Sequence, residues 1–152
     1  MNILVVDDER EFRLLLKSSL SGEGRIIFLA ENGEDALARM KTSEIDLFIS
    51  DVYMPVMDGI KLRRKVRQIP GYERVPFLFV SGYDDESTKG TVQDPRIDGF
   101  FKKGRSMEEL KEWIAYLTAP EDKRPKIPPA AKERSMSEKK RDPGRRGGSP
   151  RI

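Results

Sequence analysis

Cysteine and histidine are both absent from the 152 residues of this chain. Without cysteine the chain has no disulfide framework and no thiolate site, and this composition fits a reducing compartment. Without histidine it can form neither a histidine metal site nor a Ser-His-Asp triad, and it cannot itself carry phosphohistidine. No apolar run approaches the roughly 20 residues that a membrane span needs, and the start MNILVVDDER does not resemble a signal peptide. We therefore expect a cytoplasmic protein without a membrane span.

Charge and proline divide the chain into two parts. Residues 119–152 hold 11 Lys and Arg against 5 Asp and Glu, together with six of the ten prolines, whereas residues 1–118 hold 18 Lys and Arg against 21 Asp and Glu. Large apolar residues are scarce in the second part, so it cannot bury enough surface to offset the entropy lost on ordering. We predict one domain over residues 1–118 and a basic, disordered tail rich in proline and glycine over residues 119–152. Its charge could attract anionic surfaces, but nucleic acid is not an expected partner.

Short apolar runs alternate with amphipathic stretches through the first part. Apolar runs of this kind predict buried strands, and the stretches between them show the spacing of helix faces. The last helix has an N-cap signal, Ser106 followed by Glu109. The expected fold is an α/β, doubly wound, five-stranded parallel sheet with helices on both faces. The predicted strands are Ile3–Val6, Ile26–Ala30, Leu47–Ser50, Phe77–Ser81 and a short one at Phe100 and Phe101.

Polar residues that could bind ions or take part in a reaction follow four of these strands. Each of them alone is ordinarily a turn former, a helix cap or a solvated charge. Together they meet at the carboxyl edge of the sheet, where ligands of such folds bind. Several adjacent carboxylates repel one another unless a cation lies among them, and oxygen ligands alone suit Mg²⁺. A lysine and a hydroxyl beside them suit phosphoryl oxygens. The residues are Asp7, Asp8 and Glu9, then Asp51, then Ser81, and then Lys102 and Lys103.

The segments VVDDE, DVYMPVMDG, FVSG and FFKK, in this order, resemble the receiver domain of bacterial response regulators, and the resemblance covers residues 1–118. It implies a flavodoxin-like fold and a stand-alone receiver of a two-component system or phosphorelay. It also implies that Asp51 accepts the phosphoryl group. Asp8, Asp51 and the backbone carbonyl of Tyr53 would bind Mg²⁺ directly, and Asp7 would act on the metal through water.

The same resemblance assigns three further residues. Lys103 is expected to pair with the phosphoryl group, Ser81 to follow it, and Phe100 to be the aromatic switch. Gly104 stands where the family usually has proline, which predicts a looser loop after Lys103. The segment between the fourth and fifth strands, residues 84–94, is a poor helix sequence and predicts a short or mobile fourth helix.

The resemblance also implies the partners and the kind of activity. The donor would be a sensor histidine kinase or a histidine phosphotransfer protein, and the output would be a contact with a downstream protein target or a homodimer formed on phosphorylation. The chain would not be an enzyme beyond catalysing its own phosphoryl transfer and dephosphorylation. A pseudo-receiver scaffold that takes no phosphate is the main alternative. A phosphatase of the haloacid dehalogenase type would need a DxDx[TV] start, and a dinucleotide-binding domain would need a Gly-rich turn, and neither is present.

Two other features invite an interpretation. Tyr53 and Tyr83 lie two residues after Asp51 and Ser81, and they are either exposed loop aromatics or a screen that keeps water from the acyl phosphate. The third helix is crowded with cations, which favour a solvated basic face over a docking patch for an acidic partner or nucleic acid. These cations are Lys61, Arg63, Arg64, Lys65 and Arg67.

Overall fold

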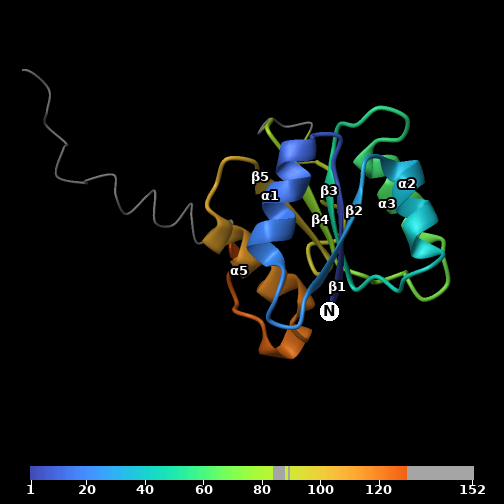
Figure 1. The fold of residues 1–152 in the computed structure, drawn as a ribbon. Helices are drawn as coiled ribbons and strands as arrows, with labels where there is room; N and C mark the ends of the chain where they lie inside the picture. The colour runs from blue at the N-terminus through green and yellow to red at the C-terminus, as the bar shows by residue number, and fades with distance from the viewer. Residues whose placement is uncertain (84–87, 89, 130–152) are drawn as a thin grey trace, which may run out of the picture.

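The structure, a computed structural model, describes residues 1–83, 88 and 90–129 (Figure 1). Five strands alternate with four α-helices in this part of the chain, and a short 3-10 helix follows the last of them. The elements are β1 (Asn2–Val6), α1 (Arg10–Leu20), β2 (Ile26–Ala30), α2 (Gly33–Met40), β3 (Leu47–Asp51), α3 (Gly59–Arg67), β4 (Phe77–Ser81), β5 (Asp98–Lys102), α5 (Met107–Thr118) and η1 (Glu121–Lys123).

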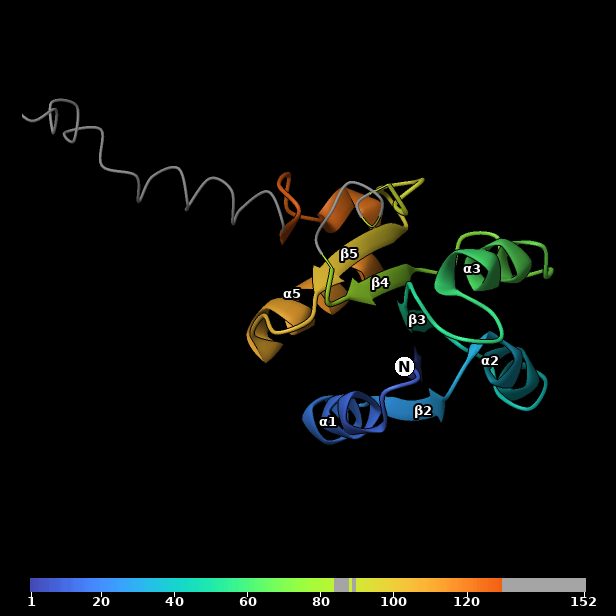
Figure 2. The same ribbon diagram turned by 90° about the horizontal axis from the view of Figure 1, so that it is seen from above.

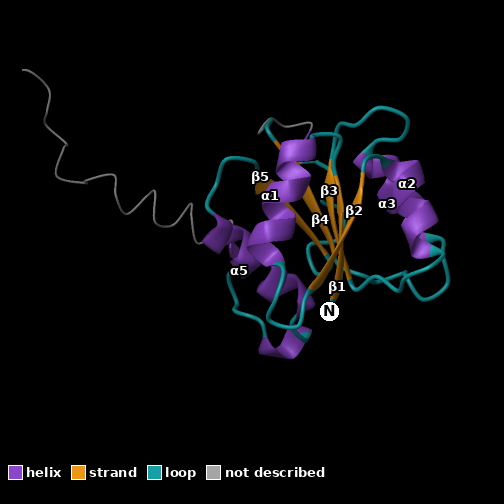
Figure 3. Ribbon diagram, viewed as in Figure 1, coloured by secondary structure: helices purple, strands orange, loops and turns teal. Residues whose placement is uncertain are grey.

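All five strands pair in parallel in the order β2-β1-β3-β4-β5. Helices α1 and α5 cover one face of the sheet, and α2 and α3 cover the other (Figures 2 and 3). The predicted doubly wound parallel sheet is therefore confirmed. None of the helices in the described residues is long and apolar enough to cross a membrane.

Two apolar clusters hold the layers together, one on each face of the sheet. Alternate residues of a strand point to opposite faces, so neighbouring β1 residues such as Ile3 and Leu4 belong to different clusters. The first cluster joins the sheet to α1 and α5, with Leu16 and Leu110 fully buried, and the second joins it to α2 and α3, with Leu62 fully buried. Because both faces are covered, β3 and β4 are buried along their whole length.

Side-chain caps fix where three of the helices begin. The side chain of Asn32 accepts a hydrogen bond from the amide of Asp35, Asp58 caps α3 in the same way, and Ser106 accepts from the amide of Glu109. Each cap satisfies one of the amides that a helix start leaves without a partner. The N-cap predicted at Ser106 is confirmed.

Five of the eleven residues of the segment predicted to hold the fourth helix, 84–87 and 89, lie outside the described residues. Residues 90–97 run in turns instead of a helix. Thr88 and Thr91 are both buried, and the hydroxyl of Thr91 donates to the carbonyl of Thr88 at 2.7 Å. The expectation of a short fourth helix stays a prediction.

Two arginines of α3 correct the expectation of a uniformly solvated basic face. Arg63 is buried, and its Nη2 lies 2.7 Å from Oδ2 of Asp98, which is itself buried in β5. Nη2 of Arg67 lies 3.2 Å from Oδ1 of the same carboxylate. Lys61, Arg64 and Lys65 are exposed as expected. The two arginines were misassigned because their acceptor lies more than 30 residues away in the sequence.

Residues 119–129 also differ from expectation. They were predicted to belong to the disordered tail, yet they include η1 and pack along α5. Nη2 of Arg124 donates to the carbonyl of Leu117 at 3.1 Å, and Glu121 pairs with Arg74. The prediction of disorder therefore does not hold for this segment, because these two charged residues have specific partners on the domain. Residues 130–152 lie outside the described residues.

Candidate functional site

The predicted site residues meet at the carboxyl edge of the sheet. Asp7 directly follows β1, Asp51 ends β3, Ser81 ends β4 and Lys103 directly follows β5. Because β1, β3, β4 and β5 are consecutive neighbours in a parallel sheet, their carboxyl ends lie side by side. The order of the strands thus brings together residues that are separated by up to about a hundred positions.

Lys103 lies at the centre of the acidic group. Its Nζ is 2.8 Å from Oδ2 of Asp7, 3.2 Å from Oδ2 of Asp51 and 3.2 Å from Oε1 of Glu9. The same Nζ lies 4.7 Å from the centroid of the Phe12 ring, a cation–π distance. One ammonium group therefore contacts three carboxylates.

Burial and mutual repulsion shift the ionisation of the two inner carboxyl groups. Burial raises the pKa of Asp51 to about 6, the charge of Asp7 adds to this shift, and Lys103 opposes it. Burial likewise raises the pKa of Asp7 above its ordinary value. Burial disfavours the charged form of Lys103, but its hydrogen bond to Asp7 and the charges of Asp7 and Asp51 outweigh that effect and raise the pKa of Lys103. The site thus holds more negative charge than a single lysine relieves.

The geometry of the carboxylates fits a divalent cation. Oxygen atoms of Asp7, Asp8 and Asp51 all lie within 4.8 Å of one another. Apart from its ion pair with Lys103, the buried Oδ2 of Asp7 finds no hydrogen-bond donor among the described residues. Asp8 is exposed to solvent, so an ion can reach the group. Carboxylates with one open side are the donor set that Mg²⁺ uses in proteins.

Ser81 and Phe100 occupy the two positions that the resemblance assigned to switching. The hydroxyl of Ser81 is buried and accepts a hydrogen bond from the amide of Tyr83 at 3.1 Å. Phe100 is partly buried, packs against the apolar cluster under α2 and α3, and pairs in register with Phe79 of β4. The strand that carries Phe100 therefore lies directly beside the strand that carries Ser81.

The loop between β3 and α3 is held close to Asp51. The amide of Gly59 donates to the carbonyl of Val52 at 2.9 Å, and a Cβ at Gly59 would lie 2.1 Å from the carbonyl oxygen of Asp51. Only glycine permits this approach. Within the loop the amide of Met57 donates to the carbonyl of Pro55 at 2.8 Å, and Val56 between them has a φ of 72°. This is the geometry of a strained γ-turn.

Gly104 adopts a backbone conformation that proline cannot share, with a φ of 95°. The preceding residue is nevertheless well anchored, because the amide of Lys103 donates to the carbonyl of Ser81 at 2.8 Å. The replacement of proline thus changes the loop after Lys103, while its backbone remains bonded to β4.

Sequence reasoning missed one supporting residue. Arg13 of α1 is buried, and its Nη1 donates to the carbonyl of Asp7 at 2.6 Å, which fixes the turn that carries Asp7 and Asp8. In the sequence, Arg13 stands out only because it follows the apolar Phe12 in a helix. A solvated arginine can occupy the same position, so the sequence does not distinguish the two cases. Glu9 had been noted after β1, but its contact with Lys103 had not been expected.

Two exposed tyrosines follow the strands that end in Asp51 and Ser81. The rings of Tyr53 and Tyr83 meet edge to face with centroids 5.9 Å apart, and both side chains are substantially exposed. They come from the loops after β3 and β4, the strands that end in Asp51 and Ser81. The two positions that sequence reasoning singled out are therefore in contact with each other.

Comparison with known proteins supports the resemblance. The family model of the response regulator receiver domain matches residues 3–115. The KDP operon transcriptional regulatory protein KdpE of Escherichia coli K12 is 34% identical over 110 residues, which cover 72% of this chain and 48% of KdpE. The response regulator MprA of Mycobacterium avium is 34% identical over 125 residues, 80% of this chain and 54% of MprA. The chain spans about half the length of these two relatives.

Solved structures lead to the same family. Chemotaxis protein CheY4 of Vibrio cholerae has a TM-score of 0.70 at 28% identity, covering 76% of this chain and 97% of CheY4. Response regulator TrrA of Thermotoga maritima, in complex with Mg²⁺ and BeF, has a TM-score of 0.66 at 33% identity, covering 76% of this chain and 97% of TrrA. Family model, relatives and fold agree, and the chain belongs to the response regulator receiver domain family.

Proposed function

We propose that this chain is a phosphorylated switch of a two-component system, in which Asp51 accepts a phosphoryl group in the presence of Mg²⁺. The observation that carries the proposal is the convergence of Asp7, Asp8, Asp51 and Lys103 at one edge of the sheet. These carboxylates carry more negative charge than one lysine neutralises. A divalent cation would neutralise the excess, and phosphoryl transfer to an aspartate uses such a cation.

Asp51 is the nucleophile in this proposal. A carboxylate oxygen of Asp51 attacks the phosphorus of a phosphohistidine, the P–N bond breaks, and its electron pair stays on the imidazole of the donor. A sensor histidine kinase or a histidine phosphotransfer protein would supply that donor. Lys103, 3.2 Å from Asp51 in the free protein, would neutralise charge on a phosphoryl oxygen. The chain is then not an enzyme with a separate substrate, because it catalyses only its own phosphorylation and dephosphorylation.

The residues that would hold Mg²⁺ are Asp8, Asp51 and the carbonyl of Tyr53, with Asp7 acting through water. When bound, the ion would supply positive charge beside the transferred group. Arg13 would keep the turn bearing Asp7 and Asp8 in place through the Asp7 carbonyl.

Ser81 and Phe100 would convert the modification into a changed surface. The Ser81 hydroxyl, now bonded to the amide of Tyr83, would turn toward a phosphoryl oxygen. The space that it leaves would let Phe100 move inward, and the surface around β5 and α5 would change for a downstream protein target. A homodimer formed on phosphorylation is a second form of the same output. Either outcome is a population shift biased by one covalent group.

Intact mass spectrometry after incubation with acetyl phosphate and Mg²⁺ tests the proposal. The protein should gain one phosphoryl group, and Asp51→Asn or omission of Mg²⁺ should abolish the gain. Asp122→Asn, which removes an exposed carboxylate of η1, is the matched control and should gain the group normally. No gain in the wild type, together with no binding of Mg²⁺, would instead favour a pseudo-receiver scaffold.

A further inference from the structure

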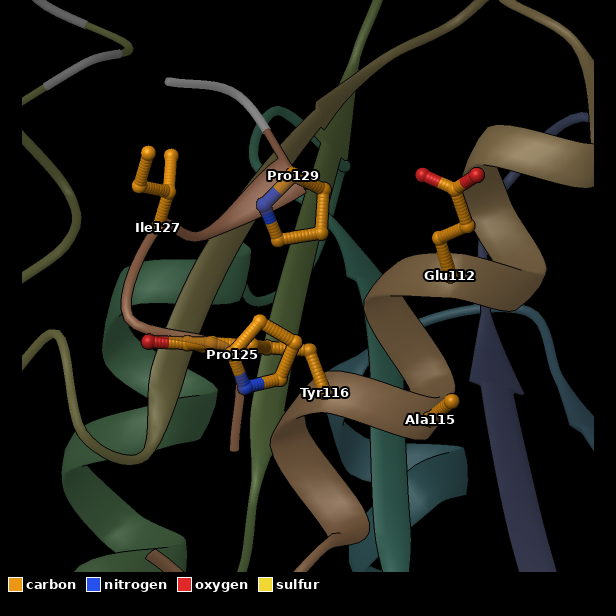
Figure 4. Close-up of a pocket in the computed structure, with 6 residues that line it drawn as sticks. All are labelled: Glu112, Ala115, Tyr116, Pro125, Ile127 and Pro129. Atoms are coloured by element: carbon orange, nitrogen blue, oxygen red, sulfur yellow. The ribbon is translucent and has the colours of Figure 1, made fainter. Parts of the chain in front are cut away.

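Residues 119–129, here called the strap, contact the last helix of the domain through Ala119 and Arg124. After α5 the chain makes the 3-10 turn η1 and returns along the outer side of α5, so that Pro125 lies near Tyr116 and Pro129 lies on the same side as Glu112 (Figure 4). Pro129 is buried although it lies near the end of the described chain. The strap thus runs beside α5, where Tyr116 is partly buried while Glu112 and Ala115 remain exposed.

Arg124 binds three backbone carbonyls, and two of them, those of Leu117 and Arg96, lie outside the strap. Its Nε donates to the carbonyl of Ala119 at 3.0 Å, its Nη2 donates to the carbonyl of Leu117 at 3.1 Å, and its Nη1 donates to the carbonyl of Arg96, just before β5. The guanidinium also lies over the ring of Tyr116, 5.2 Å from its centroid. A planar group with several donors is suited to hold segments together in this way.

The strap and α5 enclose a groove with mostly apolar walls. Prolines lose little conformational freedom on binding, which favours a persistent extended contact. The groove has a volume of about 210 Å³ and is lined by Glu112, Ala115, Tyr116, Pro125, Ile127 and Pro129 (Figure 4).

Contacts lead from the strap to the strand that carries Phe100. The ring of Tyr116 meets Trp113 edge to face with centroids 6.0 Å apart. Trp113 packs directly on Gly99 of β5, the residue before Phe100, where an added Cβ would lie 2.7 Å from the indole ring. Arg124 binds the carbonyl of Arg96, two residues before β5 begins. A shift of β5 would therefore disturb both the contact between Trp113 and Tyr116 and the carbonyl of Arg96 that Arg124 binds.

We propose that the outer face of α5 is a protein-docking surface which the strap occupies in cis, and that phosphorylation of Asp51 releases the strap. This inference rests on the proposed function of Asp51. The strap would thereby hold the part of α5 around Tyr116 until the signal arrives. Because linkage is reciprocal, weakening the strap should also favour the phosphorylated state.

Hydrogen exchange of the full chain, with and without Mg²⁺ and beryllofluoride, tests the release. The amides of Lys123 and Arg124 donate to the carbonyls of Pro120 and Glu121, so they should be protected without beryllofluoride. With it they should exchange roughly fivefold faster or more, the lower end of ordinary coupling between two sites. Rapid exchange already in the free protein would overturn the occupied state. Slow exchange in both samples, with altered exchange around Asp51, would overturn the release while leaving the proposed function intact. Unchanged amide exchange around Asp51 would contradict the proposed function itself, and the proposed release of the strap would then be wrong as well.

The reciprocal effect is measured with Arg124→Ala, using Lys126→Ala as the matched control. Both variants remove one positive charge from the strap, but Lys126 is exposed and has no side-chain contact among the described residues. Arg124→Ala should bind beryllofluoride roughly fivefold more tightly than the wild type, and Lys126→Ala should bind it with unchanged affinity. Equal affinities in all three proteins would contradict coupling between the strap and the site.

Discussion

At the scale of single residues, Val56 shows backbone strain beside the site. Its φ of 72° is costly for a β-branched residue, and its side chain is 66% exposed, so little packing compensates. Relief of such strain amounts to about 1–3 kcal/mol, from which the greater entropy of unfolded glycine subtracts about 0.5–1 kcal/mol. Val56→Gly should therefore raise the free energy of unfolding by roughly 1 kcal/mol in a urea titration. Val75→Gly, at a valine without a positive φ, should lower it. A loss of stability in Val56→Gly would mean that the turn is not strained.

Tyr83 is the second residue whose role can be isolated. Its ring contacts that of Tyr53, and both tyrosines lie two residues after the residues proposed to bind the phosphoryl group, so we expect the pair to slow attack of water on the acyl phosphate. Tyr83→Ala should release phosphate several-fold faster than the wild type once the donor is removed. Tyr83→Phe keeps the ring and should release phosphate at the original rate. Equal rates for wild type and Tyr83→Ala would show that the tyrosines are ordinary exposed aromatics.

At the scale of elements, Asp98 connects α3 to β5 and to the loop that precedes β5. Its carboxylate accepts hydrogen bonds from Arg63 and Arg67 and from the amides of Gln93 and Asp94. A buried charge left without its partner is strongly destabilising, whereas an apolar replacement of similar volume is often tolerated. Removal of the acceptor Asp98 should therefore change the free energy of unfolding more than removal of one arginine donor.

Asp98→Ala should lower the free energy of unfolding by about 3–5 kcal/mol, because two arginines and two amides lose their acceptor. Arg63→Leu should cost much less, since Arg67 and the amides of Gln93 and Asp94 still bind Asp98. Chemical denaturation of both variants gives the comparison. The opposite ranking would mean that Arg63, not Asp98, holds the cluster together.

The elements that the sequence predicts well are those whose signal is local. Continuous apolar runs such as Leu47–Ser50 locate β3 within one residue, and the Ser106 cap marks the start of α5. The burial of Arg63 could not be predicted, because an arginine on a helix is buried only if a partner such as Asp98 arrives from another strand. The same reason explains why Arg13 was missed, since its acceptor is a backbone carbonyl.

At the scale of the whole molecule, the order of the strands determines which residues meet in the site. Asp7, Asp51 and Lys103 could be placed together from the sequence because consecutive parallel strands end at one edge. The strap could not be predicted, because prolines and charges are typical both of disordered tails and of extended segments that lie on a surface. What distinguishes the two cases is the set of acceptors that Arg124 finds, and these lie on α5 and before β5.

The excess negative charge at the edge of the sheet also makes a prediction for the stability of the entire domain. A cation that binds only the folded protein raises the free energy of unfolding, by about 2.7 kcal/mol at a concentration of one hundred times its Kd. Mg²⁺ should accordingly raise the melting temperature by several degrees in a calorimetric scan, because it relieves repulsion that Lys103 alone does not balance.

Asp8→Asn should remove most of this increase, because Asp8 is the exposed member of the cluster and makes no ion pair within the described residues, so its loss leaves the Lys103 contacts in place. Asp122→Asn should keep the full increase, which separates a local site from general charge screening. If Mg²⁺ raised the melting temperature of all three proteins equally, the carboxylate cluster would not be the place where the ion acts.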